Sequence, residues 1–369
     1  MGGRRAVPRI AVLGAMLLLL TGCWDQRPVE GRALVEAVGV APTTRPDTWA
    51  WTFVFPNPTE SVSSLSSLSP SDQIYAVTVS AATWTGALLK AQERTTRDLY
   101  FGQFRVLAIS PRLSAASWDR LISTFNRSGR VLKTFWIVAG HPAGAVVATA
   151  PVSEGAPLYA LFKLLACHCQ PYFWAQRAWQ VWDRLTTPGV TPIVPVITVA
   201  GPHVLNTAFA TVGPHRVFLW SARTSAGWAY LTQHVVKGGL VVRTPWGLVG
   251  LNQVRGRSRT RILTRGRMVV VTDTLAYHGA LEDLPPGLAL TTRQKTAIAR
   301  DASRTIAALC DGALQTADAQ QVDPFGWHRQ QHWAQNTAGR PWPAPIRWQH
   351  WSVHVIVHFR ITGEGVAHS

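Results

Sequence analysis

The sequence predicts an α+β protein of two to three mixed α/β domains, with a long helix in the C-terminal domain. The 369 residues are 47% hydrophobic and only 15% charged, so the chain can bury a sizeable core and is longer than one typical domain. The first half mixes apolar runs of strand type with stretches of helical spacing. The second half is rich in strand patterns, and a helical spacing then extends over residues 293–321.

Strand and helix patterns follow one another through the first half. Residues 33–43 and 49–55 predict a pair of strands, and alternation in the second strand places aromatic side chains on one face. A strand at 74–80, a helix at 85–94 and a strand at 105–109 form a strand, helix, strand unit. The other elements predicted here are helices at 118–125, 156–165 and 173–185 and a strand at 134–139. The helix at 173–185 carries an apolar stripe of Trp174, Ala178, Val181, Trp182 and Leu185.

Prolines and glycines interrupt regular structure between residues 186 and 203, and we place a domain boundary there. The predicted organisation is a leader at 1–22, an N-terminal domain at 23–195 and a C-terminal domain at 203–369. The C-terminal domain is predicted to contain strands at 204–220, 235–243, 268–277 and 351–361. Its long helix, with apolar residues recurring every three or four positions, ends at Asp323-Pro324-Phe325-Gly326.

The start of the chain has the pattern of a lipoprotein signal peptide. Three arginines precede an apolar run over residues 10–20, which is too short to span a bilayer as a helix. Leu20-Thr21-Gly22-Cys23 follows, and this lipobox places the thiol of Cys23 where it can receive diacylglycerol before cleavage. We therefore expect diacylglyceryl-Cys23 to anchor the mature protein on a membrane. An ordinary signal peptide with an incidental cysteine is the alternative.

The other cysteines and the histidines do not predict a metal site. Cys167-His168-Cys169 is too tightly spaced for the usual pair of zinc thiolates, and no second pair follows. His350, His354 and His358 would share one face of a helix, but the alternation around them predicts a strand. Residues four apart in a strand are about 13 Å apart, which is too far for one ion. We expect no metal and no cofactor.

A row of arginines is the strongest electrostatic feature. Arg255, Arg257, Arg259 and Arg261 alternate with small or polar residues, so in extended form their guanidinium groups project from one side. A formal net charge of +17 also indicates an anionic neighbour. No nucleic-acid-binding motif accompanies the row, so nucleic acid is not expected and anionic lipid is the preferred partner. A solvated strand face is an equal alternative. We expect Trp24, beside Cys23, to contact the membrane interface or a protein partner.

The common catalytic motifs are absent from the sequence. It contains no Gly-x-x-x-x-Gly-Lys phosphate loop, no His-Glu-x-x-His and no Gly-x-Ser-x-Gly. Carboxylates are also scarce, with 19 Asp and Glu residues, which leaves few pairs for acid-base hydrolysis. We expect a protein that is not an enzyme, and a lipid-anchored hydrolase is the alternative.

Four separated stretches carry a distinctive set of motifs. They are Leu20-Thr21-Gly22-Cys23-Trp24-Asp25-Gln26-Arg27, where the lipobox runs into Cys-Trp-Asp-x-Arg; residues 98–109; residues 238–256; and the region from the long helix through Asp323-Pro324-Phe325-Gly326 to Gly363. In this order and spacing they resemble the Ger(x)C lipoproteins, the third components of nutrient germinant receptors in endospore-forming bacteria. The resemblance covers nearly the whole mature chain.

The resemblance implies a fold and a function. It implies an α+β protein with largely antiparallel or mixed sheets, located on the outer face of the spore inner membrane. Its implied partners are the polytopic A and B receptor subunits, with which it assembles or signals in spore germination. A solute-binding lipoprotein that itself captures a small molecule is the alternative function.

Overall fold

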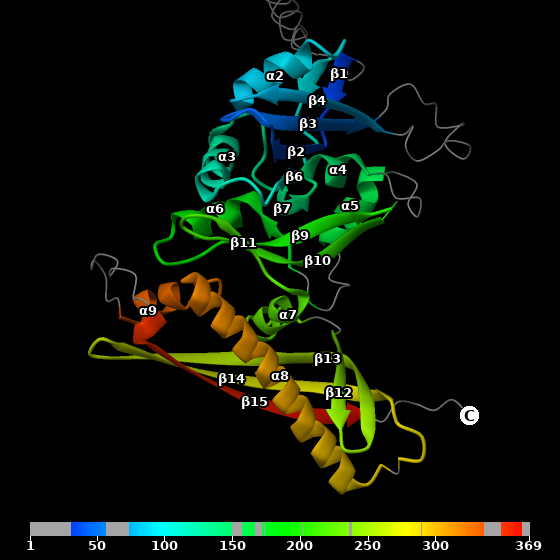
Figure 1. Cartoon of the computed structure of the whole chain (residues 1–369), viewed down its shortest axis with the longest axis vertical. Helices are drawn as coiled ribbons and strands as arrows, with labels where there is room; N and C mark the ends of the chain where they lie inside the picture. Colours follow the sequence, from blue (N-terminus) through cyan, green and yellow to red (C-terminus); the bar gives the residue numbers. More distant parts are fainter. Residues whose placement is uncertain are drawn as a thin grey trace, which may run out of the picture.

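The computed structural model describes residues 31–56, 74–149, 157–166, 172, 174–201, 203–235, 238–288, 290–335 and 348–363. In this part of the chain the strands form a nine-stranded sheet, a four-stranded sheet and a two-stranded ladder. The long axis runs from β1 (Arg32–Leu34) to the four-stranded sheet, with the nine-stranded sheet between them (Figure 1). The predicted α+β class with mixed sheets is confirmed.

The nine-stranded sheet forms the N-terminal part. Its strand order is β11-β10-β9-β7-β6-β2-β3-β4, with β8 paired to β7. Neighbours among β2, β6, β7 and β9 are parallel, whereas β3, β4, β10 and β11 pair antiparallel. The bounds are β2 (Ala37–Pro42), β3 (Trp49–Pro56), β4 (Ile74–Ala81), β6 (Val106–Ile109), β7 (Trp136–His141), β8 (Gln176–Arg177), β9 (Ile193–Ala200), β10 (His203–Val212) and β11 (Val217–Leu219). β5 (Asp98–Tyr100) pairs with β1 in the separate ladder.

Helices cover both faces of this sheet. The aromatic face predicted for β3 is buried, because Trp49, Trp51, Phe53 and Phe55 all belong to one core cluster. Three helices complete that cluster: α2 (Trp84–Gln92), α3 (Ala115–Arg127) and α6 (Ala178–Thr186). Two helices pack against the opposite face, which includes Val54: α4 (Ala143–Ala148) and α5 (Pro157–Ala166).

Side-chain caps determine where several helices begin. Thr83, Ser114, Ser221 and Thr291 stand just before α2, α3, α7 and α8, and each accepts the backbone N–H three residues further on. A hydroxyl in this position satisfies one of the N–H groups that have no partner within the helix.

The predicted helix over 173–185 begins later than expected. α6 begins at Ala178, because Gln176 and Arg177 pair with β7 as a short strand. Trp174 is therefore not on the apolar stripe of that helix. Its indole stacks on Trp228 and on His234 instead, at centroid distances of 5.5 Å and 4.1 Å, in the core of the C-terminal part.

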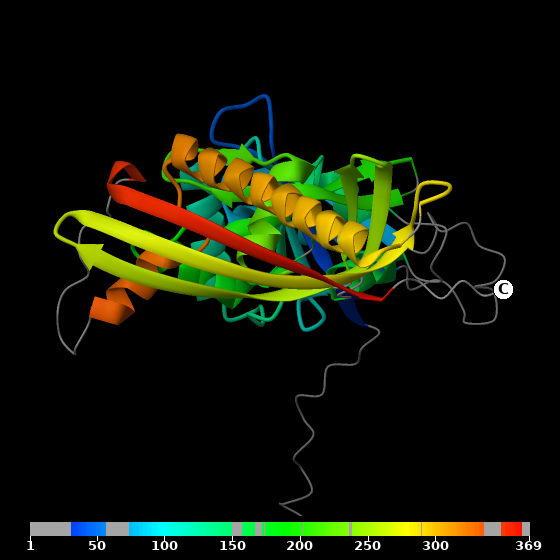
Figure 2. The ribbon, with the colours of Figure 1, turned by 90° about the horizontal axis from the view of Figure 1, so that it is seen from below.

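The C-terminal part is a four-stranded sheet with helices on one face. The strand order is β12-β13-β14-β15, with bounds β12 (Gly238–Thr244), β13 (Gly247–Arg265), β14 (Met268–Asp283) and β15 (Trp351–Gly363). The helical elements are α7 (Ala222–Leu231), α8 (Thr292–Gln320), α9 (Trp327–Gln335) and the 3-10 turn η3 (Trp348–His350). Seen from the end opposite β1, this sheet and α8 lie nearest the viewer (Figure 2).

α8 agrees closely with the long helix predicted over 293–321. Its predicted apolar stripe is buried, at Ile298, Ala302, Ile306, Leu309, Ala313 and Ala317. The helix ends at Gln321, whose backbone is left-handed with φ of 52°, and Asp323 follows two residues later. The predicted end of the long helix is therefore confirmed.

The predicted domain boundary falls in a β-hairpin. β9 and β10 lie on either side of it and pair along most of their length, and β11 extends the same sheet to Leu219. One face of this hairpin also contributes Ile193 and Phe209 to the core of the C-terminal part. The division into 23–195 and 203–369 stays a prediction, and the hairpin is the layer that the two parts share.

Candidate functional site

The proposed anchor residues Cys23 and Trp24 lie outside the described residues, as do Cys167, His168 and Cys169. None of the described helices is both long enough and apolar enough to cross a membrane. The part of the chain nearest to Cys23 that the structure describes is the turn at Gly31 and the strand β1, at one end of the long axis (Figure 1).

The arginine row is extended and exposed. Arg255, Arg257, Arg259 and Arg261 all lie on β13, and all four side chains are exposed, as the alternation predicted. The residues between them point inward and are partly buried. None of the four forms an ion pair with another described residue.

A β-bulge decides which way the arginines point. Before the bulge, the odd-numbered Val249 and Leu251 face the core. If this alternation continued along β13, the odd-numbered arginines would also face the core. The register shifts between Asn252 and Arg255, where Gln253 has a positive φ of 51°. From Val254 onward the even-numbered residues face the core. The extra residue therefore places the arginine row on the outer face.

Basic side chains of two neighbouring strands complete this outer face. Arg255 is in register with His278 on β14, which is in register with Arg360 on β15. Arg255 Nε donates to His278 Nε2 at 3.2 Å. His354 and His358 occupy equivalent outward positions opposite Thr272 and Ala276. We call the eight residues of this surface the basic face: Arg255, Arg257, Arg259, Arg261, His278, His354, His358 and Arg360.

The basic face can bind anions over an extended area but shows no metal geometry. His354 and His358 lie on a strand, as predicted, whereas His350 lies in the turn η3 before it. No group of three or more His, Cys, Asp or Glu residues in the described part of the chain could hold a metal ion. Guanidinium groups in a row suit carboxylates or phosphates, which accept two parallel N–H bonds from each arginine.

The basic face belongs to the C-terminal sheet, which lies toward the opposite end of the long axis from β1 (Figure 1). The opposite face of its sheet packs on α7 and α8, and α7 packs on β10. β10 lies near one edge of the nine-stranded sheet, while β4 forms the other edge, close to α2 and the β1–β5 ladder. Seven strand spacings of about 4.8 Å separate β4 from β11, so the two edges are about 34 Å apart along the sheet.

A second polar cluster lies at the junction of the two parts, around Asp323. Its Oδ1 accepts the backbone N–H groups of Phe325 (3.1 Å) and Gly326 (2.9 Å). Its Oδ2 accepts the N–H of His328 at 2.8 Å. The backbone of Asp323 exchanges two further bonds with Thr191, in the segment that leads into β9. Asp323 therefore ties the end of α8 to the N-terminal part.

Arg184 is buried beside Asp323. Its guanidinium donates to the carbonyl of Pro324 at 2.6 Å and to that of Thr191 at 3.3 Å. Burial lowers the pKa of Arg184 to about 10, which Asp323 opposes, so the group stays charged at neutral pH. Burial raises the pKa of the Asp323 carboxyl, and its N–H donors and Arg184 oppose this shift.

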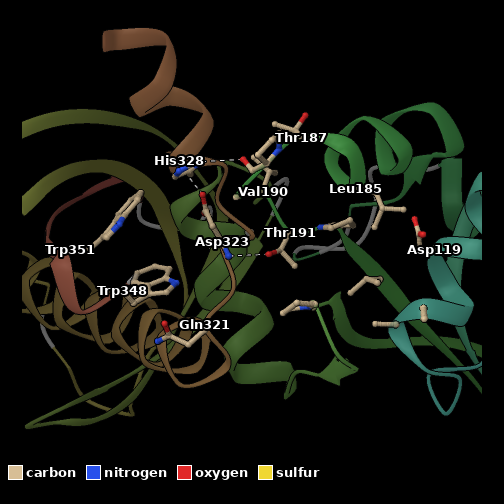
Figure 3. A pocket seen from close by; sticks show the side chains of 18 residues that line it. Asp119, Leu185, Thr187, Val190, Thr191, Gln321, Asp323, His328, Trp348 and Trp351 are labelled. Atoms are coloured by element: carbon tan, nitrogen blue, oxygen red, sulfur yellow. Dashed lines mark hydrogen bonds between the residues drawn. The ribbon is translucent and has the colours of Figure 1, made fainter. Parts of the chain in front are cut away.

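A cavity of about 620 Å³ opens next to this cluster (Figure 3). Asp119 and Leu185 line it from the N-terminal part, while His328, Trp348 and Trp351 line it from the C-terminal part. Its volume is in the range of small-molecule sites. The lining thus includes two tryptophans and the exposed Asp119, between the two parts.

Sequence reasoning found the arginine row but missed its neighbours and the junction. His278 and Arg360 join the row through strand pairing, for which only the alternation of β14 and β15 gave a signal. Asp323 was predicted only as part of a helix stop, and nothing in the sequence linked it to Arg184.

The sequence matches a family model, and the fold matches a solved structure. Residues 25–199 match a family model described as the spore germination protein N-terminal domain. The fold matches the crystal structure of the GerBC protein with a TM-score of 0.52 and 9% sequence identity, over 89% of this chain and 99% of that chain. At this identity the likeness shows the fold alone. No curated protein sequence gives a significant match.

The matched domain and the shared fold define a spore germination protein. The match over residues 25–199 confirms the resemblance to the Ger(x)C family that the four motif stretches indicated. The description of the matched family refers to spore germination and names no class of enzyme.

Proposed function

We propose that this protein is the lipid-anchored C subunit of a nutrient germinant receptor. Diacylglyceryl-Cys23 would hold it on the outer face of the spore inner membrane, where it supports assembly or signalling with the polytopic A and B subunits. The observation that carries this proposal is the match of residues 25–199 to the spore germination domain. The lipobox that ends at Cys23 supports the anchor.

The position of the basic face favours a protein partner for the arginine row over lipid. Eight residues lie between Cys23 and Arg32, and the nine Cα-to-Cα steps that connect the two span at most about 32 Å. The basic face lies on the C-terminal sheet, beyond the nine-stranded sheet along the long axis from β1, and on the side of that sheet opposite α7 and α8 (Figure 1). A membrane that holds Cys23 therefore lies nearer β1, so an acidic surface of a receptor subunit is the better match for the row.

The anchor is tested by changing Cys23→Ala in the sporulating organism. The protein should then be lost from washed membranes, because it carries no acyl chain. Spores should respond poorly to nutrients while still germinating by routes that bypass the receptors. Cys310→Ala is the control, because it removes a thiol that is buried in the C-terminal core. Full membrane retention of the Cys23→Ala protein would count against the anchor.

Partnership is tested by affinity capture from spore membranes in mild detergent. The A and B subunits should be recovered with the wild-type protein. Arg257→Glu/Arg259→Glu should reduce that recovery, while a charge reversal of matched size at Arg112 and Arg130, on the N-terminal part, should not. Capture that brings down no polytopic partner would argue against the receptor assignment.

The junction cavity supports a second candidate, a lipoprotein that binds a small solute itself. Its 620 Å³ would enclose a molecule the size of an amino acid or a sugar. Thermal unfolding with panels of amino acids, sugars and nucleosides tests this, because a ligand of the native state raises the melting temperature. Trp348→Ala should remove any such rise in melting temperature. If no compound in the panel raises the melting temperature, only the receptor role is left as a candidate.

A further inference from the structure

Three arginines line a second cavity, at the β1 end of the molecule. This cavity has a volume of about 510 Å³ and lies between β1, the facing ends of β3 and β4, and the turn from α2 to β5. Its lining residues are Arg32, Ala33, Leu34, Phe55, Pro56, Tyr75, Arg94, Thr95, Thr96 and Arg97. None of these lining residues carries a carboxylate, so the lining itself is basic; the nearest carboxylate in the ladder is that of Asp98, which is in register with Arg32. We call it the arginine pocket.

The fold holds this arginine pocket in shape. Arg94 Nη1 donates to the carbonyl of Thr78 at 2.8 Å, and the guanidinium of Arg32 lies 4.6 Å from the ring centroid of Tyr100. The carbonyl of Arg97 accepts bonds from Gln92 Nε2 (2.8 Å) and Thr95 Oγ1 (3.0 Å), which fix the turn that carries this arginine. Two guanidinium groups and one loop are therefore ordered before any ligand arrives.

One side of the arginine pocket is apolar. Ala33, Leu34, Phe55 and Pro56 contribute to the lining, and the ring of Phe55 stacks on Tyr75 at 5.5 Å. Tyr75 and Tyr100 are 46% and 40% exposed at this end of the molecule. Tyrosines that are half-exposed beside arginines are the composition found where proteins meet the interface of a membrane.

We infer that the arginine pocket binds the phosphate of an anionic phospholipid headgroup, with the glycerol portion of the lipid against its apolar side. A guanidinium group can donate two parallel N–H bonds to phosphate oxygens, and three arginines around one pocket favour an anionic headgroup. The lipid source is favoured over free phosphate because the pocket lies beside β1, nine residues after Cys23, and because its lining is half apolar. This inference rests on the proposed anchor at Cys23.

Binding of a headgroup in the arginine pocket would orient the molecule on the membrane. Two attachments at the same end, the acyl chains on Cys23 and a headgroup in the arginine pocket, would restrain the direction of the long axis. The basic face would then be directed away from the bilayer, toward extramembrane parts of a partner.

The test is arginine footprinting of the intact acylated protein in lipid nanodiscs. Acylation of Cys23 is first verified by mass, so that failure of the anchor is distinguished from failure of the pocket. The protein is then treated with phenylglyoxal in discs of phosphatidylcholine alone and in discs with about 30% phosphatidylglycerol, on the order of the anionic content of bacterial membranes. Modification of each arginine is followed by mass spectrometry.

The expected result is slower modification of Arg32, Arg94 and Arg97 in the discs with phosphatidylglycerol, by about tenfold. Arg255, Arg257, Arg259 and Arg261 are internal controls and should react equally in both discs. Unchanged reactivity of the three pocket arginines would overturn the inference, as would equal protection of both groups. If inorganic phosphate protects the pocket as well as phosphatidylglycerol does, the assignment to lipid is wrong.

A variant pair provides a second readout. Arg32→Gln/Arg97→Gln should abolish most of the protection of Arg94 by phosphatidylglycerol, because two of the three phosphate ligands are gone. Arg255→Gln/Arg257→Gln removes the same charge from the basic face and should leave that protection intact. Equal effects of both pairs would mean that net charge, rather than the arginine pocket, attracts the lipid.

Discussion

The backbone of Gly189 lies directly against the imidazole of His328, so no side chain fits between them. Gly189 has a φ of +73°, a region that residues with a Cβ rarely adopt. His328 Nδ1 donates to the carbonyl of Pro188 at 3.1 Å, which holds the ring in this place. The contact joins the segment before β9 to the start of α9 across the junction of the two parts.

Gly189→Ala should destabilise the protein by about 2–4 kcal/mol in the free energy of unfolding, measured by urea titration. About 1 kcal/mol comes from the left-handed backbone and the rest from the clash with His328. Gly201→Ala is the matched control, because Gly201 has a φ of +58° but open space around it. It should cost only about 1 kcal/mol, and equal losses for both variants would contradict the contact.

Arg184→Met should cost about 3–5 kcal/mol, because it leaves the buried carboxylate of Asp323 without its neighbouring positive charge. The carbonyl of Thr191 would also lose its guanidinium donor, and that of Pro324 would keep only the bond from Trp228 Nε1. Arg329→Met is the comparison, since Arg329 pairs with the half-exposed Asp183 at 2.7 Å. That surface pair should contribute at most about 1 kcal/mol. A loss below about 1 kcal/mol for Arg184→Met would mean that the junction is far more hydrated than the structure indicates.

Asp273→Asn should stabilise the protein near neutral pH. Asp273 is fully buried on β14, where its Oδ1 accepts from Ser258 and Thr260, and burial raises the pKa of its carboxyl. The folded state therefore holds this proton to a higher pH than the unfolded chain does. Stability falls as the pH rises from about 4 through the raised pKa, because the folded state binds more protons there.

Asparagine carries no charge, so the variant should lack this loss of stability with rising pH. Thermal unfolding between pH 4 and pH 8 should give similar melting temperatures for the two proteins at the acid end of this range. At the neutral end the variant should have the higher melting temperature. Asp119→Asn, at an exposed carboxylate, is the control and should leave the profile unchanged. A wild-type profile that rises with pH where the variant is flat would contradict a raised pKa for the Asp273 carboxyl.

Deletion of Gln253 should disrupt the C-terminal sheet, while Gln253→Gly should preserve it. The deletion removes the bulge and would turn four guanidinium groups toward the core, which costs far more than the sheet can supply. Glycine keeps the bulge and relieves a strained left-handed residue, for a gain of up to about 1 kcal/mol. Circular dichroism and phenylglyoxal reactivity of Arg257 measure both effects. If the deletion variant folds and its arginines still react, the bulge does not determine which face of β13 carries the arginines.

The elements with local signals could be predicted from the sequence. α8 matched because its apolar residues recur every three or four positions and a capping threonine and a left-handed glutamine stand at its ends. The predicted pairing of β2 with β3 agrees with the structure, because alternation in β3 distinguishes its two faces. Trp174 was misplaced because an apolar residue at helical spacing does not reveal that two residues before the helix pair with a strand.

The candidate site could be predicted only in part. Alternation indicated that the four arginines share a side, but alternation cannot tell which side faces the core. That choice depends on one left-handed residue, Gln253. Arg255, His278 and Arg360 meet through strand pairing across more than 100 residues of sequence, and Asp323 meets Arg184 through tertiary packing. Neither contact produces a periodic pattern in the sequence.

The parallel pairing of β14 with β15 also bears on the order in which the protein matures. A parallel ladder cannot close through a tight turn, and in this sheet the partner strand arrives about 70 residues later in the chain. If the protein is exported as proposed, the arginines of β13 emerge well before His358 and Arg360. A partner that recognises all three strands together would then have to wait until translocation has passed residue 360, and the proposed receptor assembly would select fully delivered molecules over stalled ones.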